Sequence, residues 1–327
     1  MFYSFVIAFI AGLALNLLFV PLGKGLSFLK SHGSGISKLG GPAIFGAFAI
    51  AAVIIAAHLS QEGIRLPIIA LAFALIFLLG LIDDILDLSA SKKLIVQFLI
   101  ALILFLGGVK TQISVLPEWA NALLTLFWLV AITNAFNLLD IQDGLASGIA
   151  IICSLTFWYI ASATGNALAS LLAASLLGAN LAFLKFNFPP AKLYMGDSGS
   201  LFNGFSLAAI ALIISYAPAG REAALFTPLL ILALPLYDLL FVVIMRLISK
   251  RPITKKSKDH FVLRLITGGV SPQKAVFFMY ALNCLFNLAA ILLISTTRSW
   301  GILILSLAIF LWLAIAYKIS RISVHEI

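Results

Sequence analysis

The sequence predicts an all-α, polytopic integral membrane protein, and three observations support this. Hydrophobic residues make up 63% of the 327 positions and charged residues only 10%, whereas a soluble domain carries roughly 25% charged residues. The apolar residues form long continuous runs, and the basic residues fall mainly between alternate runs. Because so few charges cannot cover a soluble surface, lipid must solvate most of this chain.

The apolar runs define the predicted helices. A helix that crosses the hydrocarbon core needs about 20 apolar residues, and runs of this length are typical of helices rather than of barrel strands. About eleven segments qualify, at approximately 2–22, 41–59, 67–82, 94–109, 119–139, 145–163, 167–186, 201–217, 225–247, 274–295 and 300–318. The chain shows no internal repeat, so we predict one domain over residues 1–327.

The basic residues predict the orientation of these helices. The net charge of +9 is better explained by basic loops held on the cytoplasmic side than by nucleic acid, which we do not expect as a partner. All but four of the 21 Lys and Arg residues fall on one side; the four are Arg65, Lys110, Arg221 and Arg298. The positive-inside rule then places the N-terminus outside and the C-terminus in the cytoplasm of the inner (plasma) membrane. The cytoplasmic loops are about 23–40, 83–93, 140–144, 187–200 and 248–273.

The acidic residues gather on the same side. Seven of the eight Asp residues lie in or beside the predicted cytoplasmic loops, and only Asp238 lies within a span. Carboxylates crowded on one face repel one another unless a cation or a basic group offsets them. In a purely structural alternative each acid pairs with a nearby lysine, as Asp87 could with Lys92 or Lys93. The other acids have no close basic neighbour in sequence, which favours a catalytic, metal-binding site.

The first two motifs lie at predicted helix ends. Asp87 lies four residues after Asp83 and three after Asp84, so all three can face one side of a helix end. This spacing suits Mg²⁺ or a Mg²⁺-bound phosphate. The second motif repeats a polar residue every third position, and polar groups in an apolar helix end are costly unless they face a cavity or the bundle interior. Its members are Asn134, Asn137, Asp140 and Asp143.

Two later motifs lie in loops. Gly196 and Gly199 flank Asp197, so backbone N–H groups there could approach a phosphate at a helix start. The last loop combines the basic stretch 255–258 with Asp259, His260 and Arg264. A basic strip resting on anionic headgroups is the alternative for this loop. His260 beside Asp259 favours a role toward a ligand.

Together, in this order, the four motifs resemble the polyprenyl-phosphate N-acetylhexosamine-1-phosphate transferase superfamily (glycosyltransferase family 4). The similarity runs from about Leu39 to the end of the His260 loop. It implies Mg²⁺ as the cofactor, with Mn²⁺ as the alternative, and it implies Asp197 as the principal metal ligand. The full set of implied roles is catalysis by Asp83, Asp84 and Asp143, a metal site at Asp197 and Asn137, and substrate contacts from Lys93, Asn134, Asn137, Asp140, Asn187, His260 and Arg264.

One departure from the family pattern bears on the sugar. The pentapeptide transferases of peptidoglycan synthesis carry three consecutive histidines in the last loop, and many GlcNAc-type relatives carry Asp-His-x-His-His-Arg. This chain keeps His260 and Arg264 but has Val262 and Leu263 where two histidines would stand. The resemblance is therefore closer to the undecaprenyl-phosphate GlcNAc-1-phosphate transferase branch than to phospho-N-acetylmuramoyl-pentapeptide transferase.

The resemblance also implies a reaction. A polyprenyl phosphate in the membrane attacks the sugar-bearing phosphate of a cytosolic UDP-N-acetylhexosamine, giving polyprenyl-diphospho-HexNAc and UMP. Asp83 or Asp84 would orient or deprotonate the acceptor, and Asp143 and His260 would help to bind the nucleotide sugar. A two-step route through an aspartyl-phosphate remains the alternative mechanism, and a homodimer is left open. The rival function is a secondary transporter, whose ionisable groups lie near the bilayer midplane in repeated halves.

Overall fold

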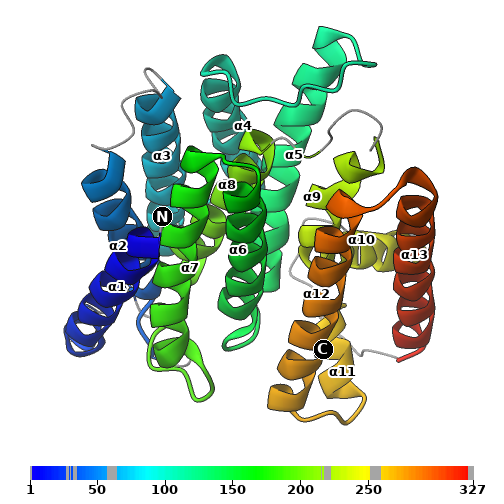
Figure 1. Ribbon diagram of the computed structural model, residues 1–327. Helices are drawn as coiled ribbons and strands as arrows, with labels where there is room; N and C mark the ends of the chain where they lie inside the picture. The colour runs from blue at the N-terminus through cyan, green and yellow to red at the C-terminus, as the bar shows by residue number, and fades with distance from the viewer. Residues whose placement is uncertain are drawn as a thin grey trace. The chain divides into compact units, whose positions relative to one another are not determined.

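The computed structural model describes residues 2–26, 29, 31, 35–56, 65–214, 216, 222–250 and 259–322. Within these ranges the elements are helices and there is no β-strand (Figure 1), which confirms the all-α prediction. They are α1 (Phe2–Leu22), α2 (Gly40–Ala56), α3 (Arg65–Leu86), α4 (Ala90–Leu106), α5 (Glu118–Leu139), α6 (Leu145–Ala163), α7 (Ala167–Asn187), α8 (Gly196–Ile213), the 3₁₀ helix η2 (Glu222–Phe226), α9 (Thr227–Ile231), α10 (Ala233–Ile248), α11 (Phe261–Thr267), α12 (Pro272–Ser295) and α13 (Arg298–Ser320).

A helix lies at the position of every predicted span. Seven of the described helices are long and apolar enough to cross a membrane, or up to eight if the bent segment 222–248 is one span. The seven are α1, α3, α5, α6, α7, α12 and α13. A multi-pass membrane protein is thus supported, while the count of eleven and the orientation stay predictions.

The ninth predicted span is broken. The segment before Leu232 (Glu222–Ile231) and the helix after it (Ala233–Ile248) meet at 71°. A break in an apolar segment frees backbone groups that lipid cannot satisfy. Here the Asn287 side chain on α12 donates from Nδ2 to the Ile231 carbonyl at 3.2 Å, so the neighbouring helix supplies one of the missing partners.

The predicted loop 248–273 is not wholly irregular, because α11 lies within it. The basic stretch with Lys255, Lys256 and Lys258 lies outside the described residues. The contacts divide the chain into two compact units, Met1–Ile214 and Ser215–Ile327, and each is described by itself. The prediction of one domain over 1–327 stays a prediction.

In the first unit, α7 and α8 form the centre. Helices α1, α2 and α6 pack on α7, and α3 and α5 pack on α8 (Figure 1). Helix α7 is rich in Ala and Ser, and small residues let helix backbones approach closely; a Cβ at Gly178 would lie 2.9 Å from the Phe9 nitrogen of α1. The close packing fixes the ends of α3, α5 and α8, where the acidic motifs lie.

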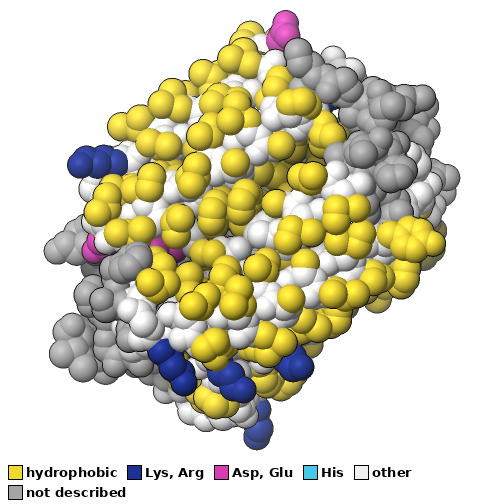
Figure 2. All heavy atoms as spheres, turned by 90° about the vertical axis from the view of Figure 1, so that its left-hand side faces the viewer, with side chains coloured by type: hydrophobic (Ala, Val, Ile, Leu, Met, Phe, Trp, Pro, Cys, Tyr) yellow, Lys and Arg dark blue, Asp and Glu magenta, His cyan; other side chains and the backbone are white. Residues whose placement is uncertain are grey.

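The outer surface of this unit is apolar. Figure 2 shows a broad hydrophobic face with the charged side chains gathered at its rim. Exposed leucines, isoleucines and valines on α1, α2 and α3 contribute, among them Leu17, Leu18, Val53 and Leu71. A contiguous apolar face this broad is what a lipid-facing surface requires.

Candidate active site

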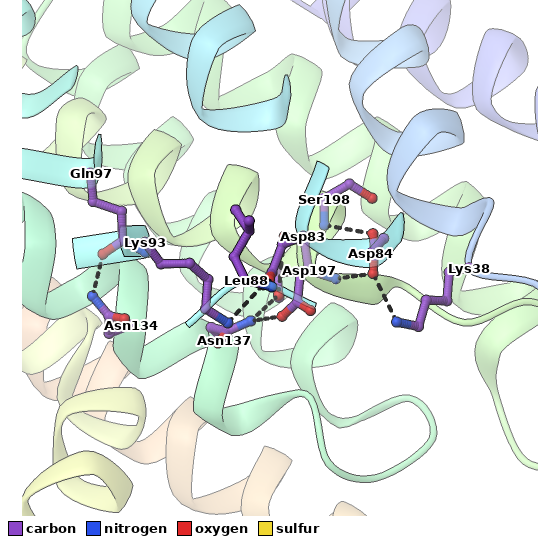
Figure 3. A network of polar contacts seen from close by, with 11 residues as sticks. Lys38, Asp83, Asp84, Leu88, Lys93, Gln97, Asn134, Asn137, Asp197 and Ser198 are labelled. Carbon is purple, nitrogen blue, oxygen red and sulfur yellow. Dashed lines mark hydrogen bonds and ion pairs between the residues drawn. The ribbon is translucent and has the colours of Figure 1, made fainter. Parts of the chain in front are cut away.

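Four helix ends in the first unit bring together residues far apart in the sequence. Asp83 and Asp84 lie in the last turn of α3, Asn137 in the last turn of α5 and Asp197 in the first turn of α8 (Figure 3). Lys93 reaches them from the first turn of α4. Helices α3 and α8 come this close because residue 80 is glycine: a Cβ at Gly80 would lie 2.5 Å from the Ser198 Cα.

Asp84 binds the start of α8. Its Oδ1 accepts the Asp197 N–H at 2.9 Å and its Oδ2 accepts the Ser198 N–H at 3.0 Å, while Lys38 Nζ lies 3.2 Å from Oδ1. The first N–H groups of a helix lack partners within the helix, and negative charge is favourable there. From the sequence, these N–H groups were expected to approach a phosphate. In the structure they donate to the Asp84 carboxylate. Asp84 fixes the turn that carries Asp197.

Asp83 pairs with a lysine that was considered, from the sequence, as a partner of Asp87. Its Oδ2 lies 2.7 Å from Lys93 Nζ, and its Oδ1 accepts the Leu88 N–H at 2.8 Å. Lys93 was the lysine considered for Asp87. Instead it pairs with the buried Asp83 in the last turn of α3.

Asn137 links Asp197 to the body of α8. Its Nδ2 donates to Asp197 Oδ1 and, at 3.0 Å, to Ser200 Oγ (Figure 3). Asn134, one turn earlier on α5, donates instead to Gln97 Oε1 at 2.6 Å and to the Val130 carbonyl at 2.8 Å. The structure thus brings Asn137 to the predicted metal ligand, whereas Asn134 joins α5 to α4.

Asp140 and Asp143 follow α5. Burial and repulsion from Asp197, Asp84 and Asp143 raise the pKa of the Asp140 carboxyl from 3.8 to about 8. The Oδ2 of Asp143 accepts the Ala191 N–H at 3.2 Å, which ties the loop after α5 to the loop before α8.

Asn187 braces the same two loops. Its Oδ1 accepts the Gly144 N–H at 2.9 Å and its Nδ2 donates to the Leu193 carbonyl at 3.0 Å, and the residue is buried. Gly144, at φ +79°, adopts the left-handed conformation that favours glycine. Asn187 therefore positions the chain around the site, and its predicted contact with the nucleotide stays a prediction.

We use the name acidic cluster for the carboxylates of Asp83, Asp84, Asp140, Asp143 and Asp197. These carboxylates outnumber the basic groups that bind them. Within 4.0 Å of the carboxylates, among the described residues, the Lys and Arg partners are Lys38 and Lys93. Burial raises the pKa of Asp140 most, and repulsion from Asp197, Asp84 and Asp143 adds to it. While Asp140 holds its proton, the other four carboxylates of the cluster still face these two lysines.

This imbalance fits a divalent cation. The described residues contain no group of three His, Cys, Asp or Glu arranged to hold a metal ion. Mg²⁺, however, commonly uses one or two carboxylates and completes its shell with water and substrate phosphates. Asp197 with the amide of Asn137 satisfies that requirement in kind, although the amide here faces Asp197 through its nitrogen.

The second unit contains the remaining predicted residues, His260 and Arg264. His260 Nδ1 lies 2.7 Å from Asp238 Oδ2, and the Phe261 N–H donates to Asp238 Oδ1 at 2.7 Å. Asp238 is the one acid within a predicted span, and no partner was predicted for it from the sequence. The signal was present: a buried acid requires a partner, and His260 lies in the loop that follows the same helix.

Arg264 binds the C-terminal end of α13. Its guanidinium binds Asp259 Oδ1 at 2.6 Å and the Ile322 carbonyl at 2.6 Å, and the side chain is buried. Val262 is buried in α11, and Leu263 on the same helix is half-buried. The two positions where relatives carry histidines are thus part of a packed helix.

Known proteins place the chain in a family. The model of glycosyl transferase family 4 matches residues 66–215, the segment that contains the acidic cluster. A probable undecaprenyl-phosphate N-acetylglucosaminyl 1-phosphate transferase of Bacillus subtilis (strain 168) is 33% identical over 313 residues, covering 89% of this chain and 86% of that protein. The phospho-N-acetylmuramoyl-pentapeptide-transferase of Bacillus thuringiensis (strain Al Hakam) is 33% identical over 237 residues, covering 64% of this chain and 73% of that protein. The chain belongs to glycosyl transferase family 4.

Proposed function

We propose that the chain transfers HexNAc-1-phosphate from a UDP-N-acetylhexosamine to polyprenyl phosphate, with GlcNAc as the sugar and undecaprenyl phosphate as the lipid. The products are polyprenyl-diphospho-HexNAc, which would initiate a cell-surface polysaccharide, and UMP. An oxygen of the acceptor phosphate forms a bond to the sugar-bearing phosphorus. The bond from that phosphorus to the bridging oxygen breaks, and its electron pair leaves with UMP.

One observation carries this proposal: the two lysines that bind the acidic cluster are partly exposed, whereas the carboxylates that they bind are buried. The Lys38 and Lys93 side chains are 26% and 21% exposed, whereas those of their partners Asp84 and Asp83 are 0% and 1% exposed. A reaction between two polyanions needs cationic groups at the open side of its site. The buried carboxylates hold the lysines in place, and the lysines are the groups that meet phosphate.

The acceptor needs little help from a base. The second pKa of a phosphate monoester is about 6, so the group is mostly dianionic at neutral pH. Lys93 can hold this phosphate while Asp83 fixes the lysine, and Asp84 fixes the helix start that bears Asp197. A bound Mg²⁺ would neutralise developing charge on the transferring phosphate. Asp197, with Asn137 beside it, is the residue proposed to hold that ion, and Mn²⁺ is the alternative.

The direct test is turnover by the purified protein. Undecaprenyl phosphate, Mg²⁺ and a panel of UDP-sugars should yield UMP together with a lipid-linked sugar phosphate identified by mass spectrometry. Omitting the lipid phosphate should stop UMP release. If no donor yields UMP while liposomes containing the protein take up a labelled solute, the chain is a transporter and the proposal is wrong.

We further propose that the acidic cluster faces the cytoplasm of the plasma membrane, because the nucleotide sugar is cytosolic and the basic residues favour that side. In a variant with Cys153 and Cys284 replaced, a cysteine at Ser89, beside the cluster, should resist an impermeant thiol reagent applied to intact cells. One at Ser114, in the loop after α4, should react. The reverse labelling pattern would contradict the orientation.

A further inference from the structure

We propose that Asp238 is a positioning residue that keeps a proton on Nδ1 of His260, so that Nε2 is the only ring nitrogen able to exchange a proton or meet a ligand. The role of His260 toward substrate rests on the proposed function. The effect of Asp238 on the imidazole does not, because it follows from the chemistry of the pair.

Two hydrogen bonds fix the Asp238 carboxylate. Oδ1 accepts the Phe261 N–H at 2.7 Å and Oδ2 lies 2.7 Å from His260 Nδ1. An ionised carboxylate can only accept hydrogen bonds. We infer an ionised Asp238, because hydrogen bonds to a carboxylate favour its charged form. Nδ1 is then the donor whether the ring is neutral or protonated, and the state of Nε2 is the one that changes.

The surroundings hold this geometry rigidly. Asp238 and His260 are 1% and 2% exposed, so water does not compete for the hydrogen bond. The Tyr237 ring packs edge-on against the rings of Phe261 and Trp312, with ring centroids 5.0 Å and 4.9 Å apart. Because Phe261 directly follows His260, these rings restrict the backbone that carries the imidazole.

The cost of burying Asp238 also favours a specific role. A buried carboxylate is expensive unless it is paired and hydrogen-bonded, and a hydrophobic residue often serves stability equally well at such a position. Here one carboxylate oxygen contacts His260 and the other accepts the next backbone N–H. Together these contacts orient a single imidazole. Such partners determine which ring nitrogen of a histidine is available.

The first experiment reads the ring itself without substrate. In protein labelled with ¹⁵N-histidine, the His260 resonances, identified by their loss in His260→Gln, should show Nδ1 protonated throughout a pH titration while Nε2 gains and loses its proton. In Asp238→Asn, Nδ1 should lose this constant protonation. A wild-type His260 whose neutral form is protonated only on Nε2 would overturn the proposal, whether or not the enzyme is active.

The second experiment uses turnover. Asp238→Asn should lower kcat by roughly tenfold to a hundredfold, the range for orienting partners of functional histidines, with a smaller change in the donor KM. If Asp238 acts through His260, the double variant with His260→Gln should be no slower than His260→Gln alone. Fully multiplicative losses would overturn the proposal.

A matched control separates orientation from stability. Asn287 is another buried polar residue of the second unit, and its amide holds the break before α10. Asn287→Leu should lower the unfolding temperature while leaving kcat of the folded protein and the His260 resonances unchanged. If Asp238→Asn fails to fold, the titration of His260 in the wild-type protein decides the proposal by itself. If the wild-type protein shows no turnover, the proposed function is contradicted, but the proposal about Asp238 is not.

Discussion

The two units differ in how far their acids are balanced by basic partners. In the second unit the buried Asp238 lies against His260 and the buried Asp259 against Arg264, so both of these buried carboxylates have a basic partner. In the acidic cluster of the first unit, Lys93 and Lys38 bind Asp83 and Asp84. The half-buried Asp140, Asp143 and Asp197 have no Lys or Arg within 4.0 Å among the described residues. Paired charges hold a structure in place, whereas unbalanced charge leaves room for an ion or a phosphate from outside.

The largest effect should come from removing an unbalanced acid. Asp197→Ala should lose several kcal/mol of transition-state stabilisation, about a thousandfold in kcat, as measured by UMP release at saturating Mg²⁺. The unfolding temperature should stay close to wild type, because less repulsion remains in the cluster. The control is Glu118→Gln, whose exposed pair with Lys110 lies at the opposite end of α5. Near-normal turnover of Asp197→Ala would move the metal to Asp83 or Asp84.

The next effect concerns the acid that binds the helix start. Asp84→Asn keeps the shape of the side chain but sets an NH₂ group against the Asp197 or Ser198 N–H. Leaving a buried donor unsatisfied costs about 1–3 kcal/mol, and the misplaced Asp197 should raise the Mg²⁺ concentration needed for half-maximal activity. An unchanged Mg²⁺ dependence with a large loss of kcat would show that Asp84 meets substrate directly.

Breaking a balanced pair should act mainly on stability. Arg264→Gln removes the buried guanidinium that binds Asp259 and the Ile322 carbonyl, and loss of one partner of a buried pair costs about 3–5 kcal/mol. Thermal unfolding should therefore shift to lower temperature, while activity per folded molecule falls less than in Asp197→Ala. A loss of activity as large as that of Asp197→Ala without loss of stability would place Arg264 in the substrate site and break the comparison.

The smallest effect should appear between closely related donors. Val262 and Leu263 supply no hydrogen bonds to a sugar, and an apolar contact discriminates by only about 1–3 kcal/mol per small group. We expect kcat/KM to be highest for UDP-GlcNAc and somewhat lower for 6-deoxy relatives such as UDP-N-acetylfucosamine or UDP-N-acetylquinovosamine. UDP-N-acetylmuramoyl-pentapeptide should be refused, because α11 lacks the triple histidine; efficient turnover of it would show that α11 does not select the donor.

The sequence predicted the helices well because apolar runs and lipid determine them almost alone. It also predicted which residues the cluster contains, since polar groups at helix ends are rare in such a chain. It could not predict the partners. Lys93 at the start of α4 bonds to Asp83 at the end of α3, and Asp84 bonds to residues 197 and 198 at the start of α8. The Asp84 contacts depend on how closely α3 approaches α8, which Gly80 makes possible only in the packed structure.

The break at Leu232 has a consequence for how the protein is made. The amide that satisfies the Ile231 carbonyl belongs to a residue 56 positions later in the chain. At about 5–20 residues per second, the ribosome needs roughly 3 to 11 seconds to synthesise that stretch. The Asn287 contact at this break can therefore form only after that stretch has been translated. An unbroken helix joins residues four apart through its backbone hydrogen bonds, so none of these bonds has to wait this long.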